Sequence, residues 1–306
     1  MRGLKRQDKG KDMKNLLLLL ISCTTDVGII TVDKQQNDSA VTDTYKEAET
    51  SNEQETDMQA EEPSGTVGLV EWKLEQIACL PCMGVTQEIT VEFKADFHEK
   101  LNESHPTWIP EQGQCVQNLN YLTLSRDSID AGNSLNIQGN FSGFQAYKGG
   151  ENIYSTFITE SQYERDANYK VSTQEEDTLD FNSIRGFDYI EPVELRYVDP
   201  SYAFATPIYR TGSTFWWGPS GTNETFNITL AVYSQDGSQI LGYISCSGGD
   251  SGLMTIPGQY LSGFPSWSLV AVHMTRFSKQ KVLFEKLNGY VDVHLYWSVV
   301  GTGHIE

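Results

Sequence analysis

The chain is poor in basic residues and, beyond its N-terminal segment, has no long hydrophobic run. It has 22 Lys and Arg against 41 Asp and Glu, which gives a formal net charge of -19 over 306 residues. This charge repels phosphate groups and removes the counterion release that drives most nucleic-acid binding, so we expect no nucleic-acid partner. A chain that crosses a membrane several times would need further apolar runs of about 20 residues, so that class is also excluded.

The first 22 residues have the pattern of an export signal. Six basic side chains lie among residues 2–14, and the apolar run Leu16–Ile21 follows them. This run is far shorter than the ~20 residues of a membrane span. It ends in Leu20-Ile21-Ser22-Cys23, which resembles the lipobox of bacterial lipoprotein precursors. The resemblance implies that Cys23 is lipidated and becomes the first mature residue, and Thr24 after it favours the outer membrane. An ordinary secretory signal before an unmodified cysteine is the alternative.

Residues 23–65 have the composition of a disordered tether. Between residues 26 and 65 there are eleven acidic residues, two lysines and one aromatic residue, Tyr45. So polar a segment cannot bury enough apolar area to offset its chain entropy, and its like charges repel one another. We expect it to separate a folded body from the membrane. Without residues 1–22 the net charge becomes -23, which favours cationic over anionic partners.

From about Thr66 the sequence alternates between apolar and polar residues, as half-buried strands do. The clearest runs are residues 89–97, 226–232 and 291–299. Asp236-Gly237 and Asn288-Gly289 follow the pattern of tight hairpin turns. No segment sustains a helical apolar stripe over three turns, so the predicted fold class is all-β.

The ordered body is too long for one immunoglobulin-like sandwich of about 100 residues. We therefore predict two such units, an N-terminal one over residues 66–190 and a C-terminal one over residues 191–306. One large sandwich with long insertions is the alternative.

Several short motifs of the body resemble those of uncharacterised β-rich lipoproteins of predatory and soil bacteria. The resembling segments are Ile129-Asp130-Ala131-Gly132, Leu135-Asn136-Ile137, Phe215-Trp216-Trp217-Gly218-Pro219, Ile244-Ser245-Cys246 and Thr255-Ile256-Pro257. This resemblance supports the fold class and implies no ligand.

Four further cysteines, Cys79, Cys82, Cys115 and Cys246, allow three interpretations. In an oxidising envelope they form two disulfides, and we expect Cys115 to pair with Cys79 or Cys82. The Cys79-x-x-Cys82 spacing also occurs in redox sites, but these need a βαβ unit that the sequence does not predict. A zinc site would need a second such pair.

The segment Gly249-Asp250-Ser251-Gly252 resembles the nucleophile loop of trypsin-like serine proteases. The resemblance implies Ser251 as the nucleophile of an atypical secreted serine hydrolase. That chemistry also needs a histidine base and a carboxylate that orients it, and the upstream candidates, His98 and His105, lie in no protease motif. The other interpretation is a glycine-rich loop between two strands, with no catalytic residue in the chain.

Exposed aromatic residues are the most plausible binding surface. Adjacent side chains of a strand point to opposite faces, so at least one ring of the Trp216-Trp217 pair should point away from the core. With Trp267, this ring could form a platform for sugars, although core packing is the other common role of tryptophan.

No cofactor is expected from the sequence. Acidic loops such as residues 175–180, or Asp236 with Asp250, could hold Ca²⁺, but a solvated acidic surface explains them as well. We therefore predict a non-enzymatic, lipid-anchored envelope protein, in the outer membrane and on its periplasmic or surface face. Its role would be adhesion, recognition of a protein or glycan, or scaffolding.

Overall fold

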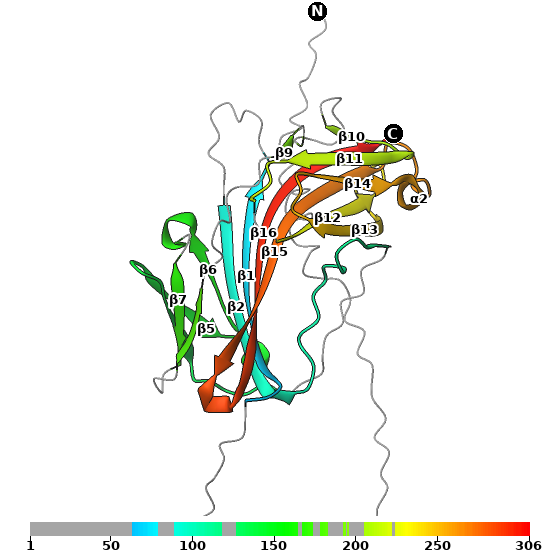
Figure 1. Ribbon diagram of the computed structural model, residues 1–306. Coiled ribbons are helices and arrows are strands. Elements are labelled where there is room, and N and C mark those ends of the chain that lie inside the picture. The colour runs from blue at the N-terminus through cyan, green and yellow to red at the C-terminus, as the bar shows by residue number, and fades with distance from the viewer. Residues whose placement is uncertain are drawn as a thin grey trace, which may run out of the picture.

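The computed structural model describes residues 63–78, 89–117, 127–164, 167–173, 178–182, 192–193, 195, 205–221 and 224–306. These residues are almost entirely β-strand, which confirms the predicted all-β class (Figure 1). The strands are β1 Thr66–Ile77, β2 Ile89–Leu101, β3 Cys115–Gln117, β4 Ser134–Gln138, β5 Gly143–Lys148, β6 Tyr154–Thr159, β7 Asn168–Ser172, β8 Thr178–Asn182, β9 Pro192–Val193, β10 Thr206–Ile208, β11 Gly212–Trp217, β12 Thr225–Tyr233, β13 Ile240–Gly249, β14 Leu253–Pro257, β15 Leu269–Phe284 and β16 Gly289–Ile305. Helix within the described ranges comprises α2 (Gly258–Leu261) and three single 3₁₀ turns, Gly150–Asn152, Glu160–Gln162 and Glu285–Leu287.

The strands form one large sheet and one small sheet. The large sheet has 13 strands in the order β3-β13-β12-β15-β16-β1-β2-β6-β5-β4-β7-β8, with β10 also paired to β16. Its longest members, β15 and β16, run from one end of the molecule to the other (Figure 1). The small sheet has the order β14-β11-β9. β8, the last strand of this order, lies close to β15. The part of the sheet from β15 to β8 is therefore strongly curved, and its concave side encloses side chains.

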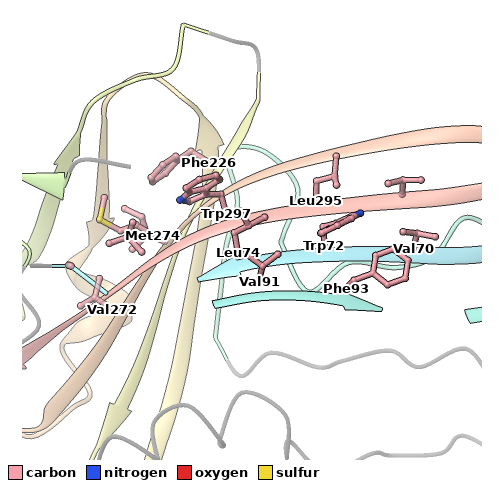
Figure 2. Packing of buried hydrophobic residues seen from close by; sticks show 14 of the residues in the cluster. Val70, Trp72, Leu74, Val91, Phe93, Phe226, Val272, Met274, Leu295 and Trp297 are labelled. Atoms are coloured by element: carbon pink, nitrogen blue, oxygen red, sulfur yellow. The ribbon is translucent and has the colours of Figure 1, made fainter. Parts of the chain in front are cut away.

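The large sheet contains strands from both of the predicted units, residues 66–190 and residues 191–306. β1, from the predicted N-terminal unit, pairs in parallel with β16, the last strand of the predicted C-terminal unit. A single buried cluster runs along β16 from Val70 and Trp72 at one end to Phe226 and Met274 at the other (Figure 2). The division into two immunoglobulin-like sandwiches is therefore not confirmed, because strands from both sides of residue 190 share one sheet and one core.

Aromatic rings fill the interior of the curved part. Trp72 on β1 is fully buried and meets four rings, those of Phe93, Phe144, Tyr163 and Tyr169, at centroid distances between 4.8 and 5.7 Å. Three of these contacts are edge-on and one is tilted, and none is a face-to-face stack. The predicted alternation of residues 89–97 accounts for one side of this packing, since Val91, Phe93, Ala95 and Phe97 are all buried.

Chain reversals occur at both predicted turn positions, but neither is a tight two-residue turn: residues 234–239 join β12 to β13, and residues 285–288 join β15 to β16. Gly237 has φ 71° in the turn between β12 and β13, and Asn288 has φ 45° just before β16. These left-handed conformations suit glycine and asparagine. β15 ends at Phe284, and a 3₁₀ turn over Glu285–Leu287 begins the connection to β16.

Among the described residues, a disulfide joins Cys115 to Cys246, so the expected pairing of Cys115 with Cys79 or Cys82 is wrong. The reason is strand register: β3 lies antiparallel beside β13 and places Cys115 directly opposite Cys246. Cys79 and Cys82 lie outside the described residues, as do Cys23, residues 1–22 and most of the proposed tether.

The segment between β2 and β3 crosses to the far edge of the large sheet (Figure 1). The backbone amide of His105 and its Nδ1 atom both contact a carboxylate oxygen of Asp292 on β16, at 2.7 and 3.0 Å. Trp108 then stacks on Tyr296, with ring centroids 5.7 Å apart. Burial alone would raise the pKa of Asp292, but the hydrogen bonds from His105 keep it below its ordinary value. The segment is thus fixed to β16 by one charged and one aromatic contact.

Candidate functional site

Trp216 is exposed on the small sheet because its strand alternates. On β11, Phe215 and Trp217 point into the core and are buried, whereas the Trp216 side chain is 46% exposed. This confirms the expectation that one ring of the tryptophan pair points away from the core. A rigid strand therefore presents a large, flat aromatic ring to solvent.

The surface around Trp216 carries no charge on its two longer strands. β11 (GSTFWW) and β14 (LMTIP) contain no Asp, Glu, Lys or Arg, although 21% of the whole chain is charged. Leu253 lies opposite Trp216 in the strand register and is exposed as well. Beside them, the hydroxyl oxygens of Thr214 and Thr255 are 2.7 Å apart. We call Trp216, Leu253, Thr214 and Thr255 the tryptophan face.

A buried ion pair holds the loops behind the tryptophan face. Arg276 on β15 donates through Nε to Asp250 at 2.8 Å, and neither side chain is accessible to solvent beyond 1%. The indole Nε1 of Trp217 donates to the other carboxylate oxygen of Asp250 at 2.5 Å. The backbone amide and hydroxyl of Ser220 also donate to this carboxylate, at 2.9 and 2.6 Å. Burial tends to raise the pKa of Asp250, but these hydrogen bonds together hold it below its ordinary value.

The same contacts fix the orientation of β11. The Trp217 ring stacks on Phe226 of β12, with centroids 3.7 Å apart and planes within 5°. The Trp217 amide donates to the carbonyl oxygen of Gly252, a residue with φ 87° that only glycine adopts readily. A further hydrogen bond joins Arg276 to the Gly218 carbonyl. Since Trp217 is held on three sides, the neighbouring Trp216 has little freedom to change its direction.

Ser251 does not have the partners of a protease nucleophile. Its hydroxyl donates to the carbonyl oxygen of Leu253 at 3.1 Å, and its neighbour Asp250 pairs with Arg276. His98 and His105 instead contact each other through their Nε2 atoms at 2.9 Å, and His105 contacts Asp292. All five histidines lie among the described residues, and no hydrogen bond joins any of them to Ser251. The geometry of the Gly-Asp-Ser-Gly segment is that of a loop clamped by its aspartate.

Trp267 is placed apart from β11, in the loop before β15. Its side chain is 60% exposed, and one face of the ring lies parallel to His304 on β16, with centroids 5.0 Å apart. No ring contact joins Trp267 to Trp216, so the structure does not combine them into one platform. Three further aromatic residues are also exposed, and no motif in the sequence marks them. They are Phe141, Tyr147 and Phe157.

In the part of the chain that the structure describes, no group of three or more acidic, histidine or cysteine side chains could hold a metal ion. The carboxylate of Asp250 already forms an ion pair with Arg276. Asp236 accepts hydrogen bonds from Ser234 and Ser238, which lower its pKa to about 2. Of the acidic run at residues 175–180, residues 175–177 lie outside the described residues.

Comparison with known proteins gives no family for this chain. No protein-family model matches it, and no curated protein matches it significantly. Searching the described residues for a helix long and apolar enough to span a bilayer also finds none. The site must therefore be interpreted from its own geometry.

Proposed function

We propose that the protein is a lipid-anchored component of the bacterial envelope that binds a glycan on the tryptophan face. The observation that carries the proposal is the exposed Trp216 ring on an uncharged, clamped sheet surface. An indole ring covers the apolar face of a sugar, and threonine hydroxyls can exchange hydrogen bonds with its hydroxyl groups. A binding surface that is already rigid loses little entropy when the ligand arrives.

The charge of the protein narrows the class of glycan. With a net charge of -19, and -23 without residues 1–22, the chain repels uronate and phosphate polymers. The uncharged tryptophan face also offers no partner for such groups. We therefore favour a neutral polysaccharide or one that carries amino groups.

The proposal is tested by affinity electrophoresis of the acidic protein in gels that contain one polysaccharide each. Hydroxyethylcellulose and glycol chitosan are the neutral and cationic probes, and alginate is the anionic one. We expect at least one of the first two to retard the protein, and Trp216→Ala to weaken this binding about tenfold or more. Phe157→Ala is the control, because Phe157 is also an exposed aromatic residue and lies on a different strand, β6. Failure of both probes, or equal retardation of the Trp216→Ala protein, would reject the tryptophan face as a glycan site.

The lipid anchor rests on the lipobox resemblance at residues 20–23. Two or three acyl chains would hold the protein on a bilayer almost permanently, since each buried methylene contributes about 0.8 kcal/mol. Cells fed alkyne-tagged palmitate should label the wild-type protein and leave the Cys23→Ala protein unlabelled. Equal labelling of both would contradict the anchor without affecting the tryptophan face.

A further inference from the structure

Two exposed aromatic residues flank Glu306 at the end of β16. On one side β10 pairs in parallel with β16, and the amide of Glu306 donates to Ile208, the residue before Tyr209. On the other side the Trp267 amide donates to Ile305 at 2.7 Å. Tyr209 and Trp267 therefore lie one strand away from Glu306 in opposite directions, which separates their Cα atoms by about 10 Å. We call Tyr209, Glu306 and Trp267 the aromatic row.

Trp267 is held in place at some cost in backbone energy. It has φ 65°, which is uncommon for a residue with a bulky side chain. The loop is fixed on both sides, since Ser268 donates to Pro265 and Gln235 donates to the Ser266 carbonyl oxygen. Strained residues of this kind persist where the surroundings determine them and often serve a binding role. Here one face of the ring packs on His304, and the 60% exposure leaves the other face to solvent.

Among the described residues, no lysine or arginine pairs with the carboxylate of the row. The Glu306 side chain is 41% exposed, and its contact is with His304, whose Nε2 atom is 3.2 Å away. The nearest arginine in sequence, Arg210, donates its guanidinium group to the Ser262 carbonyl oxygen instead. His304 itself is buried, and its Nδ1 atom has no hydrogen-bond partner.

We propose that the aromatic row binds an organic cation, such as a quaternary or alkylated ammonium group. The electron-rich faces of Trp267 and Tyr209 attract a cation, most strongly one that is weakly hydrated, and Glu306 lies between them as its counter-charge. The Cα atoms of Tyr209 and Trp267 are about 10 Å apart, a distance that the two side chains and one small cation can span. The large negative charge of the whole chain raises the local concentration of such ligands. This site shares no residue with the tryptophan face and does not depend on the glycan proposal.

The test is a titration with choline, followed through the indole resonances of the intact protein by NMR. The neutral isostere 3,3-dimethylbutan-1-ol has the same shape without the charge and serves as the matched probe. We expect choline to shift the Trp267 resonance saturably and to bind at least tenfold more tightly than the isostere. Glu306→Gln should weaken choline binding five- to tenfold, and Tyr209→Ala should weaken it by a similar factor. Added salt should reduce binding further.

Trp216→Ala is the control and should leave choline binding unchanged, because Trp216 is outside the row. Tyr209 and Glu306 are exposed, so their variants should fold even if Trp267→Ala does not. Three results would overturn the proposal: no saturable shift with choline, equal affinity for the isostere, or full affinity in Glu306→Gln. Equal affinity for the two probes would indicate an apolar contact that does not recognise charge.

Discussion

The buried histidine His294 should make the protein less stable as the pH falls from 7 to 5. It lies on β16, and its side chain is enclosed by Phe277 and Tyr296, with ring centroids 5.6 and 6.3 Å away. Burial lowers its pKa to about 4, against an ordinary value of 6.5. The neighbouring Glu71 and Asp292 carboxylates oppose this shift, and His105 and Lys279 add to it.

The sign follows from where the proton binds. Below pH 6.5 the unfolded chain protonates this histidine, but the folded protein stays neutral there until about pH 4. Proton uptake therefore favours the unfolded state, and stability is full above pH 6.5 and falls between pH 6.5 and 4. A tenfold change in proton affinity is worth about 1.4 kcal/mol, so the complete effect is about 3 kcal/mol and the part reached at pH 5 is about 2 kcal/mol.

The perturbation is His294→Gln, which keeps a polar side chain but cannot titrate. Urea unfolding of both proteins at pH 8, 7, 6 and 5 gives the free energy of unfolding at each pH. His273, whose pKa burial also lowers to about 4, remains in both proteins and cancels from their difference. Between pH 8 and 5 the variant should gain about 2 kcal/mol relative to the wild type. A difference that does not change with pH would refute the assignment of a buried neutral histidine.

Two further predictions concern the contacts that close the fold. Replacing both Cys115 and Cys246 by serine removes a link across 131 residues of sequence and should lower the free energy of unfolding by about 2–5 kcal/mol in urea denaturation without reductant. Arg276→Met leaves the buried Asp250 carboxylate without its cation and should cost about 3–5 kcal/mol, and Asp250→Asn in the same chain should recover part of this loss. If Arg276→Met is as stable as the wild type, the ion pair does not hold the loops behind Trp216.

The local features of the fold could be read from the sequence because they depend on neighbouring residues. Alternation in residues 89–97 predicts which side chains of β2 are buried, and the turns at Gly237 and Asn288 follow from backbone preference. The partner of Cys115 and the parallel pairing of β1 with β16 depend on strand order, which no short segment encodes. For the same reason, the sharing of one sheet by strands from both sides of residue 190 could not be predicted from the sequence.

The candidate site was predictable to a similar degree. Strand alternation is enough to place one ring of the Trp216-Trp217 pair in solvent, but it does not say which ring. That choice depends on Asp250, which binds the Trp217 indole and is 33 residues away in the sequence. The positive φ of Trp267 could not be predicted from the sequence, because bulky residues such as tryptophan rarely adopt this conformation.

The Gly-Asp-Ser-Gly segment shows why a short motif needs its surroundings before it implies chemistry. In the protease motif the serine is activated by a histidine, whereas here the motif's aspartate is neutralised by Arg276 and its serine donates to a backbone carbonyl. The glycines keep a purely conformational role, since Gly252 has φ 87° and accepts the hydrogen bond that aligns Trp217. A loop whose sequence resembles a nucleophile loop instead fixes the strand that presents Trp216.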